Sequence, residues 1–270
     1  MTTTPVSSPA MRLATWNVNS LKARLGRVEE WLGEIQPDVL CVQETKLADD
    51  AFPALSLASV GYDGVHHGQG RWNGVAILSR VGIDDVVHGF AVGPPDPEAR
   101  LLSARCGSTV VVTAYAPNGR AVGHEQFFYK LGWFERLLEH IDAIADPSDD
   151  VVVCGDLNIA PEDRDVWDVT AIHGATHITS DERARFRSLL EWGMEDVLRR
   201  AHPDVDRLYT WWDYRAGNFH KHKGMRIDHL LATRSLAERL TWCIVDRNAR
   251  KGAGPSDHAP LMAQFDTEPC

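Results

Sequence analysis

Eight polar residues stand at or near the ends of short apolar runs in this sequence: Asn17, Glu44, Tyr115, Asp156, Asn158, Asp228, Asp257 and His258. Taken singly, each has a simpler explanation, because a lone Asp or Asn after a strand is usually a turn former. A tyrosine before an alanine and a proline is likewise more often a packing residue. The joint occurrence of these residues instead favours one polar site on the rim of a sheet, where a rigid scaffold positions several side chains.

Four of these residues have the chemistry of ligands for a hard metal ion. Glu44 and Asp257 offer carboxylate oxygens of the kind that Mg²⁺ prefers, in octahedral coordination with several waters retained. Asn17 and Asn158 would add neutral ligands or hydrogen bonds without adding charge. The residue types therefore indicate a Mg²⁺ site.

Hydrolysis of a phosphodiester also requires an activated water and a group that binds the anionic phosphate. Asp156 is placed to orient or deprotonate the water. His258 would contact the phosphate if a carboxylate, such as that of Asp228, orients its ring. An acid–base pair of this kind typically contributes ~10²–10⁴ in rate. Metal-assisted hydrolysis of a phosphate ester is the reaction that this set of residues suits.

The apolar runs themselves predict the elements that carry these residues. Seven short runs bounded by turn residues are typical of buried strands: Leu13–Trp16, Val39–Gln43, Val75–Leu78, Val110–Ala114, Val151–Cys154, Ile227–Ala232 and Leu261–Phe265. Helical spacing of apolar residues appears over 25–35 and 127–141, and Thr179 with Glu182 forms a capping-box pattern ahead of a third helix. Many short strands with a few helices predict one α/β domain built on two packed sheets.

Length and composition are those of a globular protein. The chain has 270 residues, of which 44% are hydrophobic, and five scattered cysteines without metal-ligand spacing. The polar, proline-containing start predicts a disordered leader over residues 1–10, followed by a single catalytic domain over 11–270. The net charge of −10 argues against a nucleic-acid partner, because affinity for DNA comes mainly from neutralising phosphates. That objection is limited, since binding depends on one face and the net charge averages over all of them.

In order and spacing, these residues resemble the exonuclease III family of abasic-site endonucleases, within the endonuclease/exonuclease/phosphatase superfamily. The resemblance covers residues 11 to about 265 and is carried by the segments 16–24, 43–46, 72–76, 115–119, 155–158, 209–214, 226–231 and 256–260. Glu44, Asp156 and Asp257-His258 would fit any member of the superfamily. Asn19-Ser-Leu-Lys-Ala-Arg24 and Tyr209-Thr-Trp-Trp-Asp-Tyr214 fit its DNA-repair branch better than its lipid or inositol-phosphate branches.

The resemblance implies a four-layered α/β sandwich, with two mixed sheets flanked by helices and the site at one end. It implies a Mg²⁺-dependent phosphodiesterase of base excision repair, with Mn²⁺ as a possible substitute. Such an enzyme incises duplex DNA 5′ to abasic sites and removes 3′ nucleotides, 3′-phosphates and other 3′-blocking groups. Residues implied as metal ligands are Asn17, Glu44, Asp156, Asn158 and Asp257. Those implied as catalytic are Tyr115, Asp156, Asn158, Asp228 and His258.

The resemblance also implies contacts to the substrate, from Asn19, Lys46, Asn118, Arg120, His177, Trp211 and Met225. Trp211 is expected in the sugar pocket, whereas the neighbouring Trp212 is equally consistent with the core. A local basic face is expected from Lys22, Arg24, Lys46, Arg120 and Lys223, whose phosphate contacts would position the duplex without reading its sequence. Whether one or two ions act, and whether Tyr115 or a metal-bound water protonates the leaving oxygen, stays open here.

Two residues depart from the pattern of the resemblance. Met225 stands where some relatives carry tryptophan, so the pocket wall is expected to differ there. His177 stands where several abasic endonucleases have a small residue, and a bulkier residue in some relatives accompanies 3′-end processing with weak abasic incision. A large side chain would obstruct an extruded sugar, since a flipped nucleotide needs a shaped cavity. The alternative, that His177 points to solvent, is slightly favoured at this stage.

Other functions also stay open. A superfamily relative acting on small phosphoesters, such as inositol phosphates or sphingomyelin, is mildly favoured by the acidic charge and disfavoured by the segments 19–24 and 209–214. A damage-binding module without turnover is disfavoured, because every position expected to carry chemistry holds a competent residue. Absence of a signal-peptide pattern predicts a cytoplasmic, nucleoid-associated protein. No apolar helix or heptad suggests an oligomer, so we expect a monomer acting on duplex DNA, with no membrane or protein partner.

Overall fold

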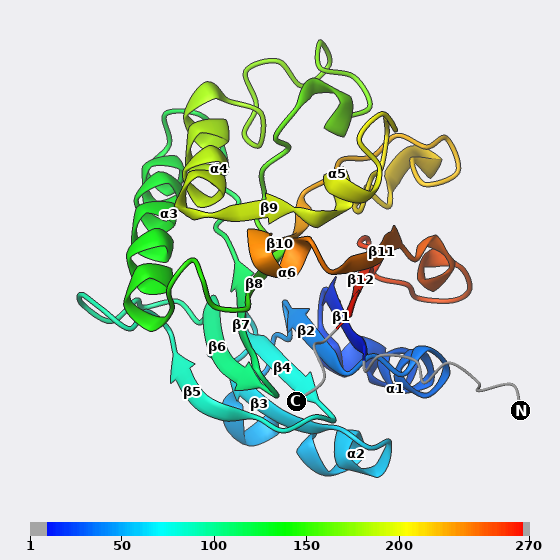
Figure 1. The fold of residues 1–270 in the computed structure, drawn as a ribbon. Helices are drawn as coiled ribbons and strands as arrows, with labels where there is room; N and C mark the ends of the chain where they lie inside the picture. Colours follow the sequence, from blue (N-terminus) through cyan, green and yellow to red (C-terminus); the bar gives the residue numbers. More distant parts are fainter. Residues whose placement is uncertain (1–9, 267–270) are drawn as a thin grey trace, which may run out of the picture.

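The computed structural model describes residues 10–266, which form two six-stranded sheets. Figure 1 shows the two sheets packed face to face. Strand order is β11-β12-β1-β2-β4-β3 in one sheet and β5-β6-β7-β8-β10-β9 in the other. The strands are β1 (Ala10–Asn17), β2 (Val39–Gln43), β3 (Asp63–His67), β4 (Val75–Ser79), β5 (Asp84–His88), β6 (Leu101–Cys106), β7 (Thr109–Tyr115), β8 (Val151–Asp156), β9 (Met194–Asp196), β10 (Asp228–Thr233), β11 (Leu240–Val245) and β12 (Leu261–Asp266).

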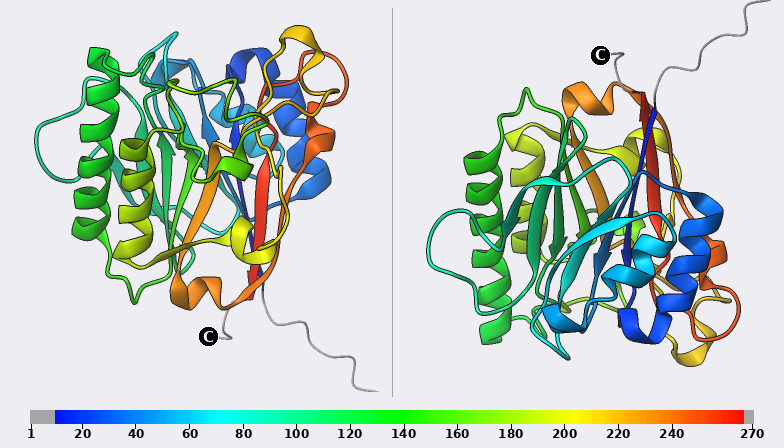
Figure 2. Two further views of the ribbon diagram at one scale, coloured as in Figure 1. Left: turned by 90° about the horizontal axis from the view of Figure 1, so that it is seen from above. Right: turned by 90° about the horizontal axis from the view of Figure 1, so that it is seen from below.

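Helices cover the outer faces of both sheets, as the two views of Figure 2 show. Helices α1 (Leu21–Ile35) and α2 (Ala54–Ser59) pack on the first sheet, and α3 (Glu125–Ile144) and α4 (Ser180–Trp192) pack on the second. The remaining short helices are α5 (Val197–Ala201), α6 (Arg234–Ala237), η1 (Asp49–Ala51), η2 (Asp163–Asp165), η3 (Arg215–Gly217) and η4 (Arg247–Arg250). The predicted four-layered α/β sandwich is confirmed.

The core lies in three layers, one between the sheets and one under each pair of helices. Between the sheets, apolar side chains of β1, β2 and β4 meet those of β6, β7, β8 and β10. Cys41 and Cys154 are buried there, as their apolar surroundings in the sequence predicted. Trp16 of β1 packs against Trp31 of α1, and Trp133 and Phe134 of α3 pack in the layer under α3 and α4.

The register of the sheets brings the polar strand ends together. The parallel pair β1 and β2 sets Asn17 opposite Gln43, the residue before Glu44. The parallel pair β7 and β8 sets Tyr115 opposite Asp156, and the antiparallel pair β8 and β10 sets Asp156 opposite Asp228. Strand pairing within each sheet, together with the packing of one sheet on the other, therefore brings residues far apart in the sequence to one edge of the sandwich.

All seven predicted strands exist, and their limits agree with the prediction to within three residues at each end. Asp228 begins β10, as predicted, while Ile227 stands just before it. The strands β3, β5, β6, β9 and β11 were not predicted. Several of these are partly exposed strands with mixed composition, such as β5 with the sequence DDVVH, which carry no continuous apolar run.

The helix predictions are also confirmed. Apolar spacing over 25–35 and 127–141 corresponds to α1 and α3, which begin four and two residues earlier. Thr179 is the N-cap of α4, and its hydroxyl accepts from the Glu182 N–H while the Glu182 carboxylate accepts from the Thr179 N–H. This reciprocal pair satisfies two backbone donors that an uncapped helix would leave free.

Most of the predicted leader lies outside the described residues, which begin at Ala10, the first residue of β1. That residues 11–270 form a single catalytic domain stays a prediction, and its last residues, 267–270, lie beyond the described part. Among residues 10–266, no helix is both long enough and apolar enough to cross a membrane.

Candidate active site

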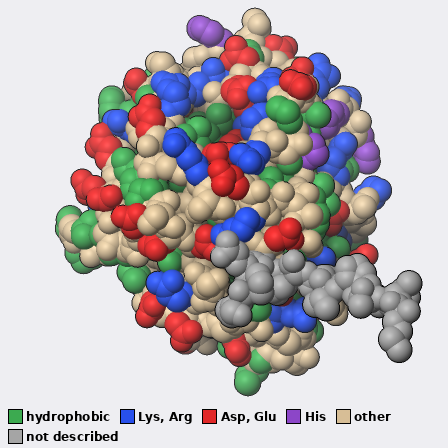
Figure 3. All heavy atoms as spheres, viewed as in Figure 1, with side chains coloured by type: hydrophobic (Ala, Val, Ile, Leu, Met, Phe, Trp, Pro, Cys, Tyr) green, Lys and Arg blue, Asp and Glu red, His purple; other side chains and the backbone are tan. Residues whose placement is uncertain are grey.

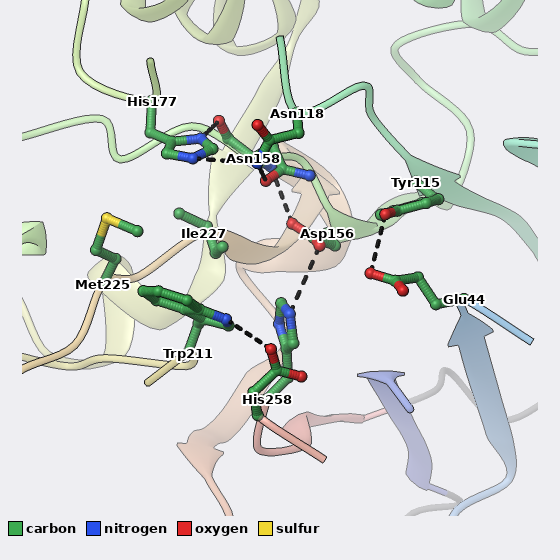
Figure 4. Close-up of a pocket in the computed structure, with 11 residues that line it drawn as sticks. Glu44, Tyr115, Asn118, Asp156, Asn158, His177, Trp211, Met225, Ile227 and His258 are labelled. Carbon is green, nitrogen blue, oxygen red and sulfur yellow. Dashed lines mark hydrogen bonds and ion pairs between the residues drawn. The ribbon is translucent and has the colours of Figure 1, made fainter. Parts of the chain in front are cut away.

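A cavity of about 300 Å³ opens at the edge where β2, β7 and β8 end and β10 begins. Figure 4 shows side chains from strand ends and connecting loops converging on it. Its lining residues are Glu44, Tyr115, Asn118, Asp156, Asn158, His177, Trp211, Met225, Ile227, Asp257 and His258. Ten of these eleven residues were predicted from the sequence, and Ile227 is the exception.

Glu44 is fixed by three hydrogen-bonding partners. Its Oε1 accepts from Asn17 Nδ2 at 3.0 Å and from the Tyr115 hydroxyl at 2.9 Å, and Lys46 Nζ lies 2.8 Å from Oε2. Burial opposes ionisation, but the hydrogen bonds from Lys46 and Asn17 outweigh it and lower the pKa of Glu44. Glu44 is therefore an anion at neutral pH, as a ligand for a cation must be.

Asp156 is the carboxylate at the centre of the site. Asn17 Nδ2 donates to its Oδ2 at 2.9 Å and the Asn158 N–H donates to its Oδ1 at 3.1 Å. Burial, together with the charges of Asp228 and Glu44, raises the pKa of Asp156 to about 7, although His258 acts in the opposite direction. A carboxylate with a pKa near neutrality is suited to accept a proton from water.

His258 lies between two carboxylates. Its Nδ1 is 2.8 Å from Asp228 Oδ2, and its Nε2 is 3.8 Å from Asp156 Oδ2. Burial opposes a charge on the ring, but Asp228 and Asp156 outweigh it and raise the pKa of His258 to about 10. The imidazole is therefore a cation at neutral pH and suits the binding of an anionic phosphate. The predicted partnership of His258 with Asp228 is present.

The donor set fits a hard divalent cation. One amide nitrogen, Asn17 Nδ2, donates to both Glu44 and Asp156, so two carboxylates lie within reach of a single small group. Ligand atoms of Asp156, Asp228 and His258 also lie within 4.8 Å of one another. His258 is engaged with Asp228 and carries a proton, so the oxygens of Glu44 and Asp156 are the better ligands. Oδ1 of Asp228 is buried with no hydrogen-bond partner among the described residues.

Asn118, Asn158 and His177 form one wall of the cavity. His177 Nδ1 lies 2.5 Å from the Asn158 carbonyl oxygen, and Asn118 Nδ2 lies 3.4 Å from both His177 Nε2 and Asn158 Oδ1. His177 is only 9% exposed, so the favoured expectation that it points to solvent is wrong. The hydrogen bonds with Asn158 and Asn118 hold the ring against the wall instead. Burial and the charge of Lys130 lower the pKa of His177 to about 4, so the ring is neutral.

Trp211, Met225 and Ile227 form the apolar wall. Trp211 pairs with Met225 through backbone hydrogen bonds, and its Nε1 donates to Asp257 Oδ2 at 3.1 Å. The other oxygen of Asp257 accepts from Asn19 Nδ2 at 3.0 Å. Trp211 is placed in the pocket as predicted, while Trp212 is fully buried in a separate core cluster with Tyr209. The cavity therefore has an apolar wall beside a polar one.

Several predicted residues support the site without lining it. Asn17 is fully buried behind the carboxylates, and Asn19 accepts from Lys46 Nζ at 2.6 Å through its Oδ1. Asp228 lies behind His258. Arg120 stands on the exposed rim, where its N–H donates to Asn118 Oδ1 at 3.2 Å. These four residues contribute to positioning rather than to the cavity surface.

The predicted basic face is only partly free to meet a phosphate. Arg24 donates to Tyr214 and to the backbone of Asn19 and Pro255, and Lys223 lies over the Trp167 ring at 4.3 Å. Lys22 is exposed. Figure 3 shows the opposite end of the sandwich, near α6, where acidic and basic side chains are interspersed.

Sequence reasoning missed a supporting residue, Arg100. Its guanidinium lies 4.7 Å from the centre of the Tyr115 ring and donates to the Tyr115 carbonyl oxygen at 3.1 Å. Arg100 stands just before β6, a strand that was not predicted, and nothing in its local sequence distinguishes it from a surface arginine.

Known proteins resemble this chain over nearly its whole length. The profile of the Endonuclease/Exonuclease/phosphatase family matches residues 14–258. Exodeoxyribonuclease III of Haemophilus influenzae is 33% identical, over 94% of this chain and 100% of that protein. An exodeoxyribonuclease of Bacillus subtilis is also 33% identical, over 93% of this chain and 98% of that protein.

Two solved structures share the fold closely. An AP endonuclease from Archaeoglobus fulgidus superposes with a TM-score of 0.92 and 40% identity, over 95% of this chain and 100% of that one. The 3′-5′ exonuclease NExo from Neisseria meningitidis superposes with a TM-score of 0.91 and 41% identity, over the same shares. NExo was also solved, under the description 3′ phosphatase, bound to a product DNA hairpin. Overall similarity does not separate the two activities.

Proposed function

The chain belongs to the endonuclease/exonuclease/phosphatase family, in its exodeoxyribonuclease III branch, and we propose that it is a Mg²⁺-dependent nuclease of DNA repair that acts mainly at 3′ ends. Its substrates would be 3′-phosphates, other 3′-blocking groups and 3′ nucleotides of duplex DNA, with incision at abasic sites as the weaker activity. The observation that carries the 3′-end preference is the buried His177 in the cavity wall.

The metal would be held by Glu44 and Asp156, with oxygens of Asn158 and Asp257 nearby, and Mn²⁺ would be an acceptable substitute. Asn17 donates from Nδ2 to both carboxylates, and its Oδ1, the atom that would coordinate an ion, stays a predicted ligand. When bound, the ion neutralises negative charge that develops on the phosphate. One ion or two would use the same carboxylates.

His258 and the amides would bind the phosphate. The His258 imidazolium is held by Asp228 and lies beside Asp156, where it can donate from Nε2 to a non-bridging oxygen. Asn118 and Asn158 present side-chain amides on the opposite wall (Figure 4), where Asn118 Nδ2 contacts His177 Nε2 and Asn158 Nδ2 donates to the Ala116 carbonyl oxygen at 3.0 Å. His258 is held by Asp228 before the substrate arrives, so it stabilises developing charge without reorganising.

Asp156 would accept a proton from the attacking water. The water oxygen forms a bond to phosphorus while the ester P–O bond breaks, and the leaving DNA oxygen takes up a proton. Burial and the charges of Glu44 and Asp156 hold the pKa of Tyr115 well above its usual value, so its hydroxyl stays protonated and can donate to the phosphate or the leaving oxygen.

His177 would restrict which sugar can occupy the cavity. A 3′-terminal nucleotide reaches the site from a free end, whereas an internal abasic nucleotide must be extruded into a cavity large enough to hold it. The imidazole occupies space on the wall where a glycine would leave it open. The neutral ring also offers no positive charge to attract an additional phosphate.

The test compares three duplex substrates, with Mg²⁺ and with EDTA: one with a tetrahydrofuran abasic analogue, one with a recessed 3′-phosphate and one with a recessed 3′-hydroxyl. We expect Mg²⁺-dependent release of 3′-phosphate to exceed incision, and both to be lost in Glu44→Ala. Dominant incision would overturn the 3′-end preference. Inactivity on all three substrates would instead favour a phosphatase of small phosphoesters, and binding without turnover would favour a damage-binding module.

A second comparison tests the role of His177. His177→Gly is expected to raise incision relative to 3′-phosphate release by roughly tenfold, within the range that steric pocket contacts usually contribute. His177→Gln, which keeps a bulky side chain, is the matched control and should leave the ratio low. An unchanged ratio in His177→Gly would exclude the steric role.

Action as a monomer on nucleoid DNA in the cytoplasm stays a prediction.

A further inference from the structure

A buried ion pair lies directly behind the cavity wall. Lys130 of α3 and Glu182 of α4 both have fully buried side chains, and Lys130 Nζ lies 2.5 Å from Glu182 Oε1. Neither residue lines the cavity, and neither belongs to the groups that would touch substrate. Burying two charges is costly even when they are paired, so such a pair adds little net stability on its own.

Glu182 is hydrogen-bonded to His177 itself, and Lys130 is hydrogen-bonded to Asn158, whose carbonyl oxygen contacts the His177 ring. Lys130 Nζ donates to the Asn158 carbonyl oxygen at 2.6 Å, and this oxygen also accepts from His177 Nδ1. The Glu182 carboxylate accepts from the His177 N–H at 2.9 Å through Oε1 and from the Thr179 N–H at 3.1 Å through Oε2. The pair therefore holds both the backbone and the ring of His177.

These contacts explain an unfavourable backbone conformation. His177 has φ of 80°, in the left-handed region that residues other than glycine rarely occupy. A residue held there persists only where its surroundings fix it, and such residues gather at functional sites. The Glu182 carboxylate fixes the backbone N–H of His177, and the Asn158 carbonyl oxygen fixes the ring through Nδ1.

The hydrogen bonds also select the tautomer of the ring. A carbonyl oxygen only accepts, so Nδ1 of His177 must carry the hydrogen and Nε2 must be the acceptor. Asn118 Nδ2 then donates to Nε2. The ring, the Asn118 amide and the Asn158 amide thus form one connected wall, anchored at its rear by Lys130.

We propose that the Lys130–Glu182 ion pair is a specificity-determining support, which fixes His177 in the cavity wall and so keeps extruded abasic deoxyribose out of the site. This inference rests on the proposed function. Lys130 and Glu182 are positioning residues, since they act only through His177 and Asn158. Without them, the wall segment would relax from its strained conformation and the cavity would admit the extruded abasic deoxyribose.

Glu182→Gln is the informative single substitution. Both oxygens of the carboxylate accept from backbone N–H groups, at His177 and at Thr179, and an amide of the same shape offers only one acceptor. One of the two attachments must therefore be lost. Lys130→Met tests the other partner, because it removes the donor to the Asn158 carbonyl oxygen.

The experiment measures kcat/KM for incision at tetrahydrofuran and for 3′-phosphate release in the full-length chain, together with binding of the tetrahydrofuran duplex in EDTA. We expect Glu182→Gln and Lys130→Met to raise the ratio of incision to 3′-phosphate release by roughly tenfold. Binding of the abasic duplex should tighten in parallel. Leu137→Ala, which weakens the same core face of α3 away from His177, is the matched control and should leave the ratio unchanged.

A double-mutant cycle separates a specific role from general loosening. In the His177→Gly background the ring is already absent, so Glu182→Gln should have no further effect on the ratio. Full additivity in this cycle, an unchanged ratio in folded Glu182→Gln, or an equal rise in Leu137→Ala would each overturn the inference. If neither single variant folds, Lys130→Met/Glu182→Gln removes both charges and the same ratio decides.

Failure of this inference differs from failure of the proposed function. If His177→Gly raises incision and the ion-pair variants do not, the proposed function stands and the supporting role is wrong. If the unmodified enzyme acts on neither substrate, the proposed function itself is wrong.

Discussion

At the scale of single residues, the site depends on how a few buried charged groups shift one another's pKa values. His258 lies between Asp228 and Asp156, and these carboxylates raise its pKa to about 10 despite its burial. The same cluster raises the pKa of Asp156 to about 7. One group is therefore a cation and its neighbour a proton acceptor at neutral pH, although both are buried in the same place.

Asp228→Asn tests this arrangement. The amide keeps the shape of the side chain but removes the charge, so the pKa of His258 falls and its alignment is lost. We expect kcat/KM for 3′-phosphate release to fall by about 10²–10⁴, and the alkaline limb of the pH profile to move to lower pH. Asp50→Asn, at an exposed position, is the control. A profile unchanged in both rate and shape would contradict the assigned role of Asp228.

At the scale of elements, the parallel pair β7 and β8 decides where Asp156 stands. Gly155 lies in β8 with φ of 136°, and a Cβ atom there would lie 2.0 Å from the Ala114 carbonyl oxygen. Only glycine allows the two strands to approach this closely. The site thus depends on a residue that has no side chain to contribute.

Gly155→Ala is therefore expected to destabilise the protein and to displace Asp156. We expect the free energy of unfolding in urea to fall by about 3 kcal/mol, since both the left-handed backbone and the overlap must be relieved. Gly107→Ala is the matched control, because Gly107 also has positive φ but faces open space. It should cost about 1–2 kcal/mol, the conformational cost alone. Equal losses in the two variants would show that the approach of β7 to β8 is not limiting.

At the scale of the whole molecule, folding keeps several buried histidines neutral. Burial lowers the pKa values of His140, His177 and His229 to about 4, and neighbouring cations contribute at the last two. Because these folded values lie below the unfolded value of about 6.5, the unfolded chain binds protons first as the pH falls. The stability that these three neutral histidines contribute is then fully present above the unfolded pKa and is lost between about pH 6.5 and 4.

His140→Gln isolates one of these contributions. His140 accepts from the Ala91 N–H and lies 2.8 Å from Ser103 Oγ, away from the cavity. We expect the variant to lose less stability than the unmodified protein between pH 7 and pH 5, by roughly 2 kcal/mol, when urea unfolding is compared at the two values. Parallel pH dependence in the two proteins would show that His140 does not contribute.

Metal binding should also act on the whole molecule. A ligand that binds only the folded state raises the free energy of unfolding by about 2.7 kcal/mol at a hundred times its Kd. Mg²⁺ should therefore raise the melting temperature, and EDTA should reverse the change. Glu44→Gln is expected to abolish the Mg²⁺ effect. A shift of the same size in Glu44→Gln would place the ion elsewhere.

The sequence by itself determined the fold class, seven strands, three helices and most of the cavity lining. Strands with continuous apolar runs can be predicted from the local sequence, and so can the polar residues at their ends, such as Glu44 and Asp156. The capping box of Thr179 and Glu182 could also be predicted, because its two residues are only three positions apart in the sequence. What the capping pattern did not show is that the same carboxylate holds Lys130, 52 residues away.

Only the tertiary structure decided how His177 is oriented and what fixes it there. The orientation depends on Asn118, Lys130, Asn158 and Glu182, which come from two helices and two loops and meet through the packing of α3 and α4 on the second sheet. No local pattern encodes such a meeting, because its energy comes from hydrogen bonds and burial between distant segments. With the same neighbouring residues in the sequence, the side chain of His177 could equally have faced solvent.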